Sequence, residues 1–297
     1  MIDFSKIKTI SIKQRKHKVT LSDLIDPSHT PIKLYDTPEF NDLIVRIKKA
    51  REHKKPLIVA MGAHTIKTGM SLLLIDLMKR GIITHIATNG AGPIHDFEIA
   101  LIGETSEYVE DTIETGLFGM IEETGVHLNA AIQEGAQQNW GYGYSIGKKI
   151  NDLDLPHKDA SIFYHAYTLG IPATVHVAIG TDIIHQHPTC DGAAIGKTSY
   201  LDFKIFTDSL SGLEGGVLLN IGSSVILPEV FLKSLSIVRN LGYPVKNITT
   251  ANLDMFSHYR PNENVVKRPT SLGGKGFMIL ERHEVIIPSL HYKLTRA

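Results

Sequence analysis

A strand–helix–strand unit in residues 56–87 constrains the fold of this chain more than any other feature. Residues 56–61 form an apolar run typical of a buried strand, and residues 66–80 have the pattern of a helix that ends at Gly81. A second apolar run follows at residues 83–87. Two strands joined by a helix within about 30 residues form a βαβ unit. The sequence therefore predicts a parallel sheet.

The alternation of strands and helices extends over most of the chain. This pattern is typical of the α/β class with a doubly wound, mostly parallel sheet. No change of composition marks a boundary between two such domains. Further strands are predicted at residues 174–179, 216–221, 245–249, 277–281 and 285–287. Helices are predicted at residues 40–53, 105–123, 126–138, 160–169, 200–210 and 228–241.

Composition narrows the possible function classes. The 297 residues include 31 basic and 31 acidic side chains, and this balance argues against a general nucleic-acid binder. The single cysteine, Cys190, rules out an internal disulfide and is typical of a reducing compartment. The N-terminal residues lack an apolar signal segment, and no apolar run reaches the roughly 18 residues of a membrane span. We therefore expect a cytoplasmic protein without nucleic-acid or membrane partners.

Residues 1–34 form a basic N-terminal arm, and residues 35–297 form the α/β domain. Six lysine and arginine side chains fall within the first 20 positions, where they alternate with isoleucine and valine. An arm that packs on a neighbouring subunit fits this composition. A solvated, partly ordered tail fits it better, because chain ends are rarely held down.

The turn after the second strand of the βαβ unit offers groups for a ligand. Thr88, Asn89 and Gly90 follow the strand directly, and Asp96 and Glu98 add carboxylates nearby. Ligands of open α/β sheets bind just beyond the carboxyl ends of the strands. The segment lacks the G-x-G-x-x-G pattern of dinucleotide-binding turns, so it also fits an ordinary tight turn before a solvated, acidic helix start.

Five predicted strands end in small or polar residues. In a parallel sheet these ends share one edge, where glycine lets a ligand approach the backbone and helix N-termini favour phosphate. Turns between strands and helices are generally rich in glycine and serine, which is the plainer explanation. The convergence of five such turns nevertheless predicts a nucleotide or dinucleotide crevice. The turns are Gly62-Ala63-His64, Asn89-Gly90-Ala91-Gly92, Gly180-Thr181-Asp182, Gly222-Ser223-Ser224 and Thr249-Thr250.

Two further segments carry reactive side chains. His185, His187 and Asp191 lie in one polar loop and could hold zinc, but no paired-ligand motif supports them, so we expect a surface or substrate-lining loop and no metal site. Lys275 stands between glycines directly before a predicted strand. It is either an exposed turn residue or, if the turn folds over the crevice, an amine with a pKa lowered by burial that can form imines.

In their order and spacing, these segments resemble deoxyhypusine synthase and its bacterial deoxyhypusine synthase-like relatives. The resemblance covers residues 35–290 approximately. It is carried by residues 87–98, 190–192, 220–224 and 273–275. It implies a single Rossmann-like domain that binds NAD, and a homotetramer with active sites at a dimer interface. It also implies that the N-terminal arm covers a neighbour's site.

The resemblance also implies a reaction. The family uses NAD to remove hydride from spermidine and passes the aminobutyl group, through an imine on an enzyme lysine, to an acceptor amine. Lys275 matches the position of that lysine, which makes it the expected catalytic residue. The expected NAD contacts are Gly62, Thr88, Asn89, Gly90, Asp191, Gly222, Ser223 and Thr249.

The chain departs from the family at three substrate positions. A histidine is replaced near Glu229, a tryptophan is replaced by Leu272, and an amine-binding aspartate falls near Lys197. The ammonium groups of a polyamine need carboxylate partners when buried. We expect Asp254, Glu263 and Glu229 to supply them.

The leading hypothesis is therefore an NAD-dependent transferase. It would move an aminobutyl group from a polyamine such as spermidine to an acceptor, a small amine in preference to a protein lysine. The alternative is an NAD-binding regulatory or binding module that lacks the transferase chemistry. A metal-assisted hydrolase that uses His185, His187 and Asp191 is a third and weaker hypothesis.

Overall fold

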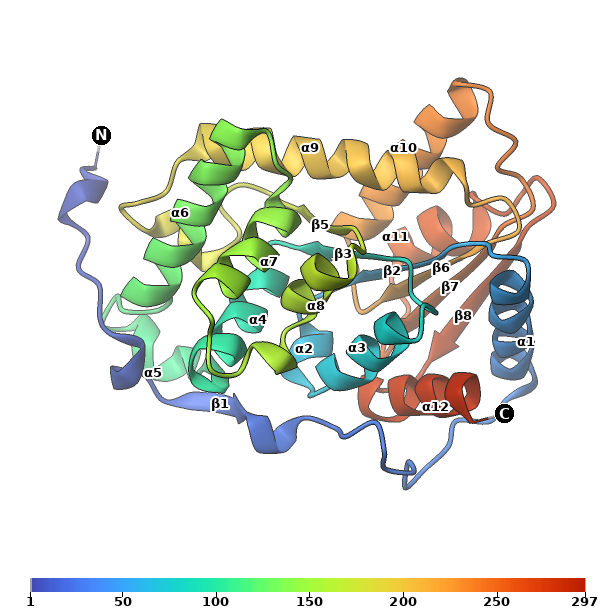
Figure 1. Ribbon diagram of the computed structural model, residues 1–297, viewed down its shortest axis with the longest axis horizontal. Coiled ribbons are helices and arrows are strands. Elements are labelled where there is room, and N and C mark those ends of the chain that lie inside the picture. Colours follow the sequence, from blue (N-terminus) through green and yellow to red (C-terminus); the bar gives the residue numbers. More distant parts are fainter. Residues whose placement is uncertain (1, 297) are drawn as a thin grey trace.

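A sheet of six parallel strands forms the centre of the molecule (Figure 1). The computed structural model describes residues 2–296. Its central strands are almost entirely buried, as parallel strands covered on both faces are. Across the sheet the order is β5-β3-β2-β6-β7-β8. These strands are β2 (Leu57–Met61), β3 (His85–Asn89), β5 (Ala173–His176), β6 (Val217–Ile221), β7 (Thr249–Asp254) and β8 (Lys275–Leu280).

The chain enters the sheet in its middle. It runs from β2 through β3 to β5 on one side, then crosses back to β6 and continues through β7 to β8 on the other side. This is the 3-2-1-4-5-6 order of Rossmann folds, in which the strand order reverses at a switch point between the first and fourth strands. Here the switch point lies between β2 and β6. The prediction of one doubly wound, Rossmann-like α/β domain is confirmed.

Helices cover both faces of the sheet and bury alternate side chains of each strand. In β2, Val59 packs into the core on one face, whereas Ile58 packs into the core on the other. The first face is covered by α1 (Pro38–Glu52), α3 (Ser71–Lys79) and α12 (His283–Thr295). The second face is covered by α9 (Gly192–Ser211) and α10 (Ile226–Asn240).

A separate group of helices forms a third hydrophobic core beyond β5. Phe97, Tyr142 and Phe163 are fully buried there. These helices are α4 (Ala91–Ile102), α6 (Glu122–Gln138), α7 (Tyr142–Asp152) and α8 (Ile162–Leu169). Short connecting elements complete the chain: α2 (His64–Lys67), η4 (Lys158–Ala160), η5 (Ile183–Gln186), α11 (Tyr259–Pro261) and the π-helical turn η6 (Asn262–Lys267).

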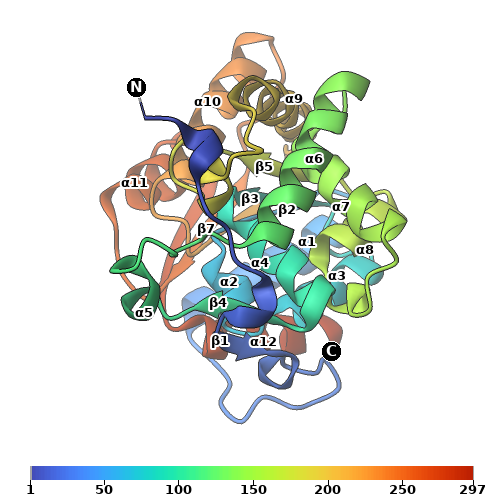
Figure 2. The same cartoon turned by 90° about the vertical axis from the view of Figure 1, so that its left-hand side faces the viewer.

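The N-terminal arm packs along its own chain. Figure 2 shows it running past α6 and α4. Ile12, Arg15 and Val19 are buried, so the expectation of a solvated tail is wrong for this part of the arm. Its strand β1 pairs antiparallel with β4. The elements concerned are η1 (Phe4–Lys6), η2 (Ile12–Gln14), β1 (His17–Thr20), η3 (Leu21–Asp23) and β4 (Glu104–Glu107).

Several segments differ from the predicted secondary structure: the predicted helix at residues 66–80 is broken between α2 and α3, and β1 and α7 were not predicted. The predicted helix at residues 105–123 is instead β4 followed by the short helix α5 (Val109–Ile113), because β1 of the distant arm offers β4 a partner. The predicted strand at residues 285–287 lies inside α12, whose burial on nearly all sides outweighs the strand propensity of its β-branched residues. The predicted strand at 245–249 ends where β7 actually begins.

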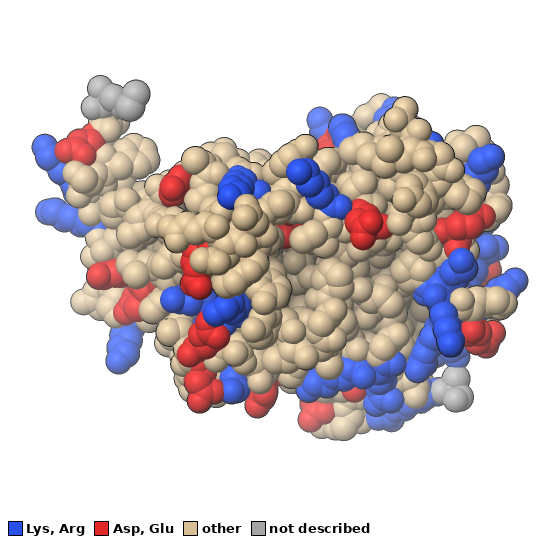
Figure 3. Space-filling view, turned by 45° about the horizontal axis from the view of Figure 1, so that its top comes forward, with Lys and Arg blue, Asp and Glu red and all other residues tan. Residues whose placement is uncertain are grey.

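The formal net charge of the chain is zero. On the face seen in Figure 3, acidic and basic side chains are interspersed around the rim and leave a wide uncharged area between them. None of the helices in residues 2–296 combines the length and apolar character needed to cross a bilayer.

Candidate functional site

The two strands that flank the switch point end in tightly apposed turns. A Cβ atom on Gly62 would lie 2.5 Å from the carbonyl oxygen of Gly222, so the two backbones can approach only without a side chain. Gly222 has φ +61°, and a Cβ there would lie 2.4 Å from the ring of His283. Ser223 follows, and its Oγ accepts a hydrogen bond from the N–H of Leu227 (3.3 Å). Three residues predicted as NAD contacts therefore meet at the switch point.

His283 is the residue at this point that sequence reasoning missed. His283 is 2% exposed, and within residues 2–296 neither ring nitrogen has a partner in good hydrogen-bond geometry, while a weak contact with the Leu253 backbone raises the pKa slightly. Burial, and then the neighbouring His64, lower the pKa of His283 and keep the ring neutral. An unpartnered buried polar group costs about 1–3 kcal/mol, so this ring is a group that an ordered water or a ligand would satisfy. The charged segment at residues 281–284, directly after β8, was the available signal.

The turn after β3 lies next to the switch point. Thr88 is fully buried, and its Oγ1 donates to the carbonyl oxygen of Asn89 (3.0 Å). A Cβ on Gly90 would lie 1.9 Å from Oδ2 of Asp182, which comes from the loop after β5. The absence of a side chain at Gly90 therefore makes room for this carboxylate at the start of α4. Four of the five predicted turns thus gather at the carboxyl edge of the sheet.

A cavity of about 360 Å³ lies at this edge, beneath the N-terminal arm. Because His64 both lines the cavity and packs against His283, the cavity adjoins the switch point. Its charged and titratable lining residues are Arg15, Lys18, His64, Lys67, His95, Glu98, Glu107 and Asp182.

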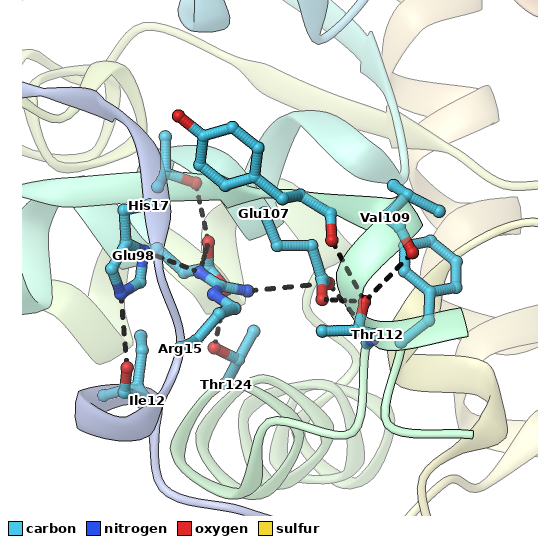
Figure 4. Close-up of polar contacts among 12 residues, drawn as sticks. Ile12, Arg15, His17, Glu98, Glu107, Val109, Thr112 and Thr124 are labelled. Carbon is cyan, nitrogen blue, oxygen red and sulfur yellow. Dashed lines mark hydrogen bonds and ion pairs between the residues drawn. The ribbon is translucent and has the colours of Figure 1, made fainter. Parts of the chain in front are cut away.

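An ion-pair network ties the arm to the wall of the cavity. Figure 4 shows Arg15 between Glu98 and Glu107, at N–O distances of 2.7 and 3.9 Å. Glu98 also accepts hydrogen bonds from Thr105 (2.6 Å) and Thr124 (2.9 Å). Burial alone would raise the pKa of Glu98, but the Arg15 guanidinium outweighs burial and holds that pKa below its usual value. The Glu98 carboxylate is therefore fully hydrogen-bonded by side chains of its own chain.

Two other charged groups in the cavity are not paired with a lysine, an arginine or a carboxylate among residues 2–296, although the Asp182 side chain caps η5 and lies 3.7 Å from Nε2 of His185. Asp182 is 8% exposed, its Oδ2 has no hydrogen bond in the described part of the chain, and burial raises its pKa to about 6. Lys67 lines the same cavity and forms no ion pair with any residue that the structure describes. The cavity therefore offers one carboxylate and one ammonium group to a ligand.

Thr249 and Lys275 lie elsewhere, and the expected convergence is wrong for both. Thr249 is the first residue of β7 and pairs with Lys275, the first residue of β8. Both belong to the amino edge of the sheet. At about 3.3 Å per residue, the six residues of β8 separate Lys275 from the carboxyl edge by about 17 Å, well beyond the reach of a lysine side chain. The turn does not fold over the crevice, and Lys275 is exposed.

The Asp191 carboxylate is used to cap a helix of its own segment. It is the N-cap of α9, where its Oδ1 accepts from the N–H groups of Ala193 (2.8 Å) and Ala194 (3.1 Å). The polar loop that contains it does not form a metal cluster within residues 2–296. The three side chains of the hydrolase hypothesis therefore remain apart, and Nδ1 of His185 accepts from backbone N–H groups of its own loop.

The carboxylates expected to bind a polyamine are mostly neutralised. Glu229 pairs with Lys233 and Arg260, and Glu263 pairs with Lys267 and Arg268. These two glutamates therefore do not offer free carboxylates. Asp254 is better placed, because it ends β7 at the carboxyl edge and is 8% exposed.

Comparisons with known proteins support the fold. No protein-family model matches this sequence, and no curated protein matches it. A provisionally assigned deoxyhypusine synthase from Entamoeba histolytica superposes with a TM-score of 0.55 at 12% identity, over 86% of each chain. A conserved, provisionally assigned LOR/SDH protein from Methanococcus maripaludis S2 gives a TM-score of 0.52 at 16% identity, over 90% of this chain and 74% of its own.

A third similar structure is a complex of AgrE with ornithine and NAD⁺. Its TM-score is 0.53 at 13% identity, over 89% of this chain and 34% of AgrE. The chain thus spans about a third of AgrE, and 31% of the arginine dihydrolase ArgZ from cyanobacteria. At these identities the likeness shows a shared Rossmann-like fold and no more.

Proposed function

We propose that this protein binds NAD at the switch point between β2 and β6 and uses it to oxidise an amine held in the adjoining cavity. The observation that carries the proposal is the pair of closely apposed glycine turns at a Rossmann switch point, with the buried ring of His283 against them. The similar structures support it: one was determined with ornithine and NAD⁺, and another is provisionally assigned as a deoxyhypusine synthase.

Groups at the switch point have the places that the ribose and the phosphates of a dinucleotide require. Rossmann folds hold the ribose with a polar side chain beyond the first turn, and the half-buried Asn89 at the end of β3 has that place. The N-termini of α4 and α10 face the same edge and favour phosphate. NAD, when bound, would supply a hydride acceptor. Loss of a hydride from the carbon next to the neutral substrate nitrogen, and of a proton from that nitrogen to solvent, would leave an imine. The protein's part is to hold that carbon at the switch point and exclude water.

Transfer of an aminobutyl group from spermidine is the more specific form that the resemblance implies. It requires Lys275 to attack the substrate imine. Because Lys275 lies at the amino edge of its own sheet, the reaction needs this lysine from a second copy of the chain. This form of the proposal therefore depends on a homo-oligomer, such as the expected tetramer, with the amino edge of one subunit on the crevice of another.

A second candidate function is NAD binding without transfer chemistry. The placement of Lys275 favours it, because in a single chain this lysine lies at the amino edge of the sheet, away from the crevice. In this case NAD would act as a bound regulator or sensor ligand.

The test separates binding from chemistry. Calorimetric titration with NAD is expected to show one site per chain, which Asn89→Ala weakens and the exposed control Asn240→Ala does not. The NADH absorbance band is then followed after addition of spermidine, putrescine, agmatine, ornithine or arginine. Formation of NADH with one of them supports amine oxidation, and borohydride trapping reports any adduct on Lys275. NAD binding without NADH would favour the second candidate, and no NAD binding would refute both.

A further inference from the structure

The hydrogen bonds around His95 fix which of its nitrogens is free. Oγ1 of Thr105 donates its single hydrogen to the Glu98 carboxylate (2.6 Å), which Arg15 keeps ionised. The same oxygen lies 2.8 Å from Nδ1 of His95, so it can only accept there, and Nδ1 carries the ring hydrogen. Burial lowers the pKa of His95 to about 4, so the ring is neutral. Its Nε2 therefore presents a lone pair.

This lone pair is available to a ligand. His95 lines the cavity, and no hydrogen bond to its Nε2 occurs among residues 2–296. The Arg15–Glu98–Thr105 chain thus turns a histidine of α4 into a fixed hydrogen-bond acceptor. Such an acceptor suits a group rich in N–H donors.

Asp182 supplies a second acceptor in the same cavity. Nδ1 of His185 accepts from the N–H groups of Gly180 (3.0 Å) and Asp182 (3.1 Å), so its ring hydrogen is on Nε2. That nitrogen is 3.7 Å from Oδ2 of Asp182, too far for a hydrogen bond. Oδ2 therefore has no hydrogen-bond partner among residues 2–296 and lies buried against Gly90, at the wall of the cavity that Asp182 lines.

We propose that His95 and Asp182 bind the ammonium group of the substrate, and that Lys67 binds its carboxylate, so that the cavity takes a small amino acid. This inference deepens the proposed amine oxidation and rests on it. An ammonium group has three N–H donors and one positive charge. His95 and Asp182 accept hydrogen bonds from it, and the Asp182 carboxylate balances its charge. Lys67 would repel the second ammonium group of a diamine but attract a carboxylate. The cavity, at about 360 Å³, is of a size for a small ligand.

The experiment uses two pairs of ligands that differ only by a carboxylate: ornithine against putrescine, and arginine against agmatine. Calorimetric titrations use the full chain with and without saturating NAD. We expect each binding amino acid to bind at least about tenfold more tightly than its decarboxylated partner, and Lys67→Met to remove that preference. Asp182→Asn should weaken both members of a pair at least about tenfold, whereas the exposed control Asp208→Asn should not.

The positioning role of Thr105 has its own test. Thr105→Val removes the hydroxyl that orients His95 and should weaken ligand binding, and Thr105→Ser should restore it. Thermal unfolding of each variant confirms that it is folded. Equal or tighter binding of putrescine and agmatine, or the absence of binding by all four ligands, would overturn the inference. NAD affinity is titrated separately, so a protein that does not bind NAD would count against the proposed function alone. Amino-acid binding to the NAD-free chain tests the present inference independently.

Discussion

The two edges of the sheet differ in how their polar groups are satisfied. At the carboxyl edge, both ring nitrogens of His283 and Oδ2 of Asp182 are buried with no well-formed hydrogen bond among residues 2–296, next to backbones so close that only glycine fits. At the amino edge, Lys275 is exposed beside Glu39 and Asp42 in a shallow depression. A buried polar group without a partner costs stability, whereas an exposed lysine costs nothing. The carboxyl edge is therefore the edge whose polar groups a ligand would satisfy.

The largest predicted effect concerns the charge network that closes the carboxyl edge. Arg15→Met removes the cation that pairs with the fully buried Glu98. Removing one partner of a buried ion pair should lower the free energy of unfolding by about 3–5 kcal/mol. Urea denaturation measures it, with Lys13→Met on the exposed side of the arm as the control. A loss no greater than that of the control would show that the arm does not contribute to this edge.

A smaller effect is predicted for two histidines of α12, His283 and His291. Replacing them should change the stability of the fold differently, which distinguishes a ligand-binding side chain from a packing one. His283→Leu removes ring nitrogens that have no partners, so it should leave stability unchanged or raise it by about 1 kcal/mol while lowering NAD affinity. His291→Leu removes a ring that bonds Asp76 (2.7 Å) and should lower stability by about 1–3 kcal/mol without affecting NAD. Thermal unfolding and NAD titration of both variants give the comparison. Equal destabilisation by both changes would make His283 a structural residue.

The glycines at the switch point give a related prediction. Gly62→Ala places a methyl group 2.5 Å from the Gly222 carbonyl oxygen and should cost about 1–3 kcal/mol, with weaker NAD binding. Gly196→Ala lies within α9, where a Cβ meets nothing within 4 Å, and should stabilise the fold by up to about 1 kcal/mol. Chemical denaturation measures both. A neutral Gly62→Ala would mean that the two turns separate easily.

The sequence predicts the carboxyl edge better than the amino edge for physical reasons. Apolar runs and glycine turns are local signals, so the sheet and four of its turns follow from residues such as Gly62 and Gly90. The start of β7 is not a local signal: Thr249 reads as the end of a strand because the apolar residues precede it, whereas pairing with Lys275 makes it the beginning. His283 shows the same limit, because only tertiary packing reveals that a ring is buried without a partner.

The smallest predicted effect decides whether the amino edge belongs to the site at all. Lys275→Ala should leave the initial rate of NADH formation within about twofold of wild type, because β8 holds this lysine about 17 Å from the crevice of its own chain. Lys67→Met, inside the cavity, is the matched control and should lower that rate. Absorbance at the NADH band measures both variants with the same substrate. A tenfold loss with Lys275→Ala would mean that a second subunit brings its amino edge to the crevice. The contrast between the two edges would then hold within a chain but disappear in the assembly, and transfer through a lysine imine would become the better account of the reaction.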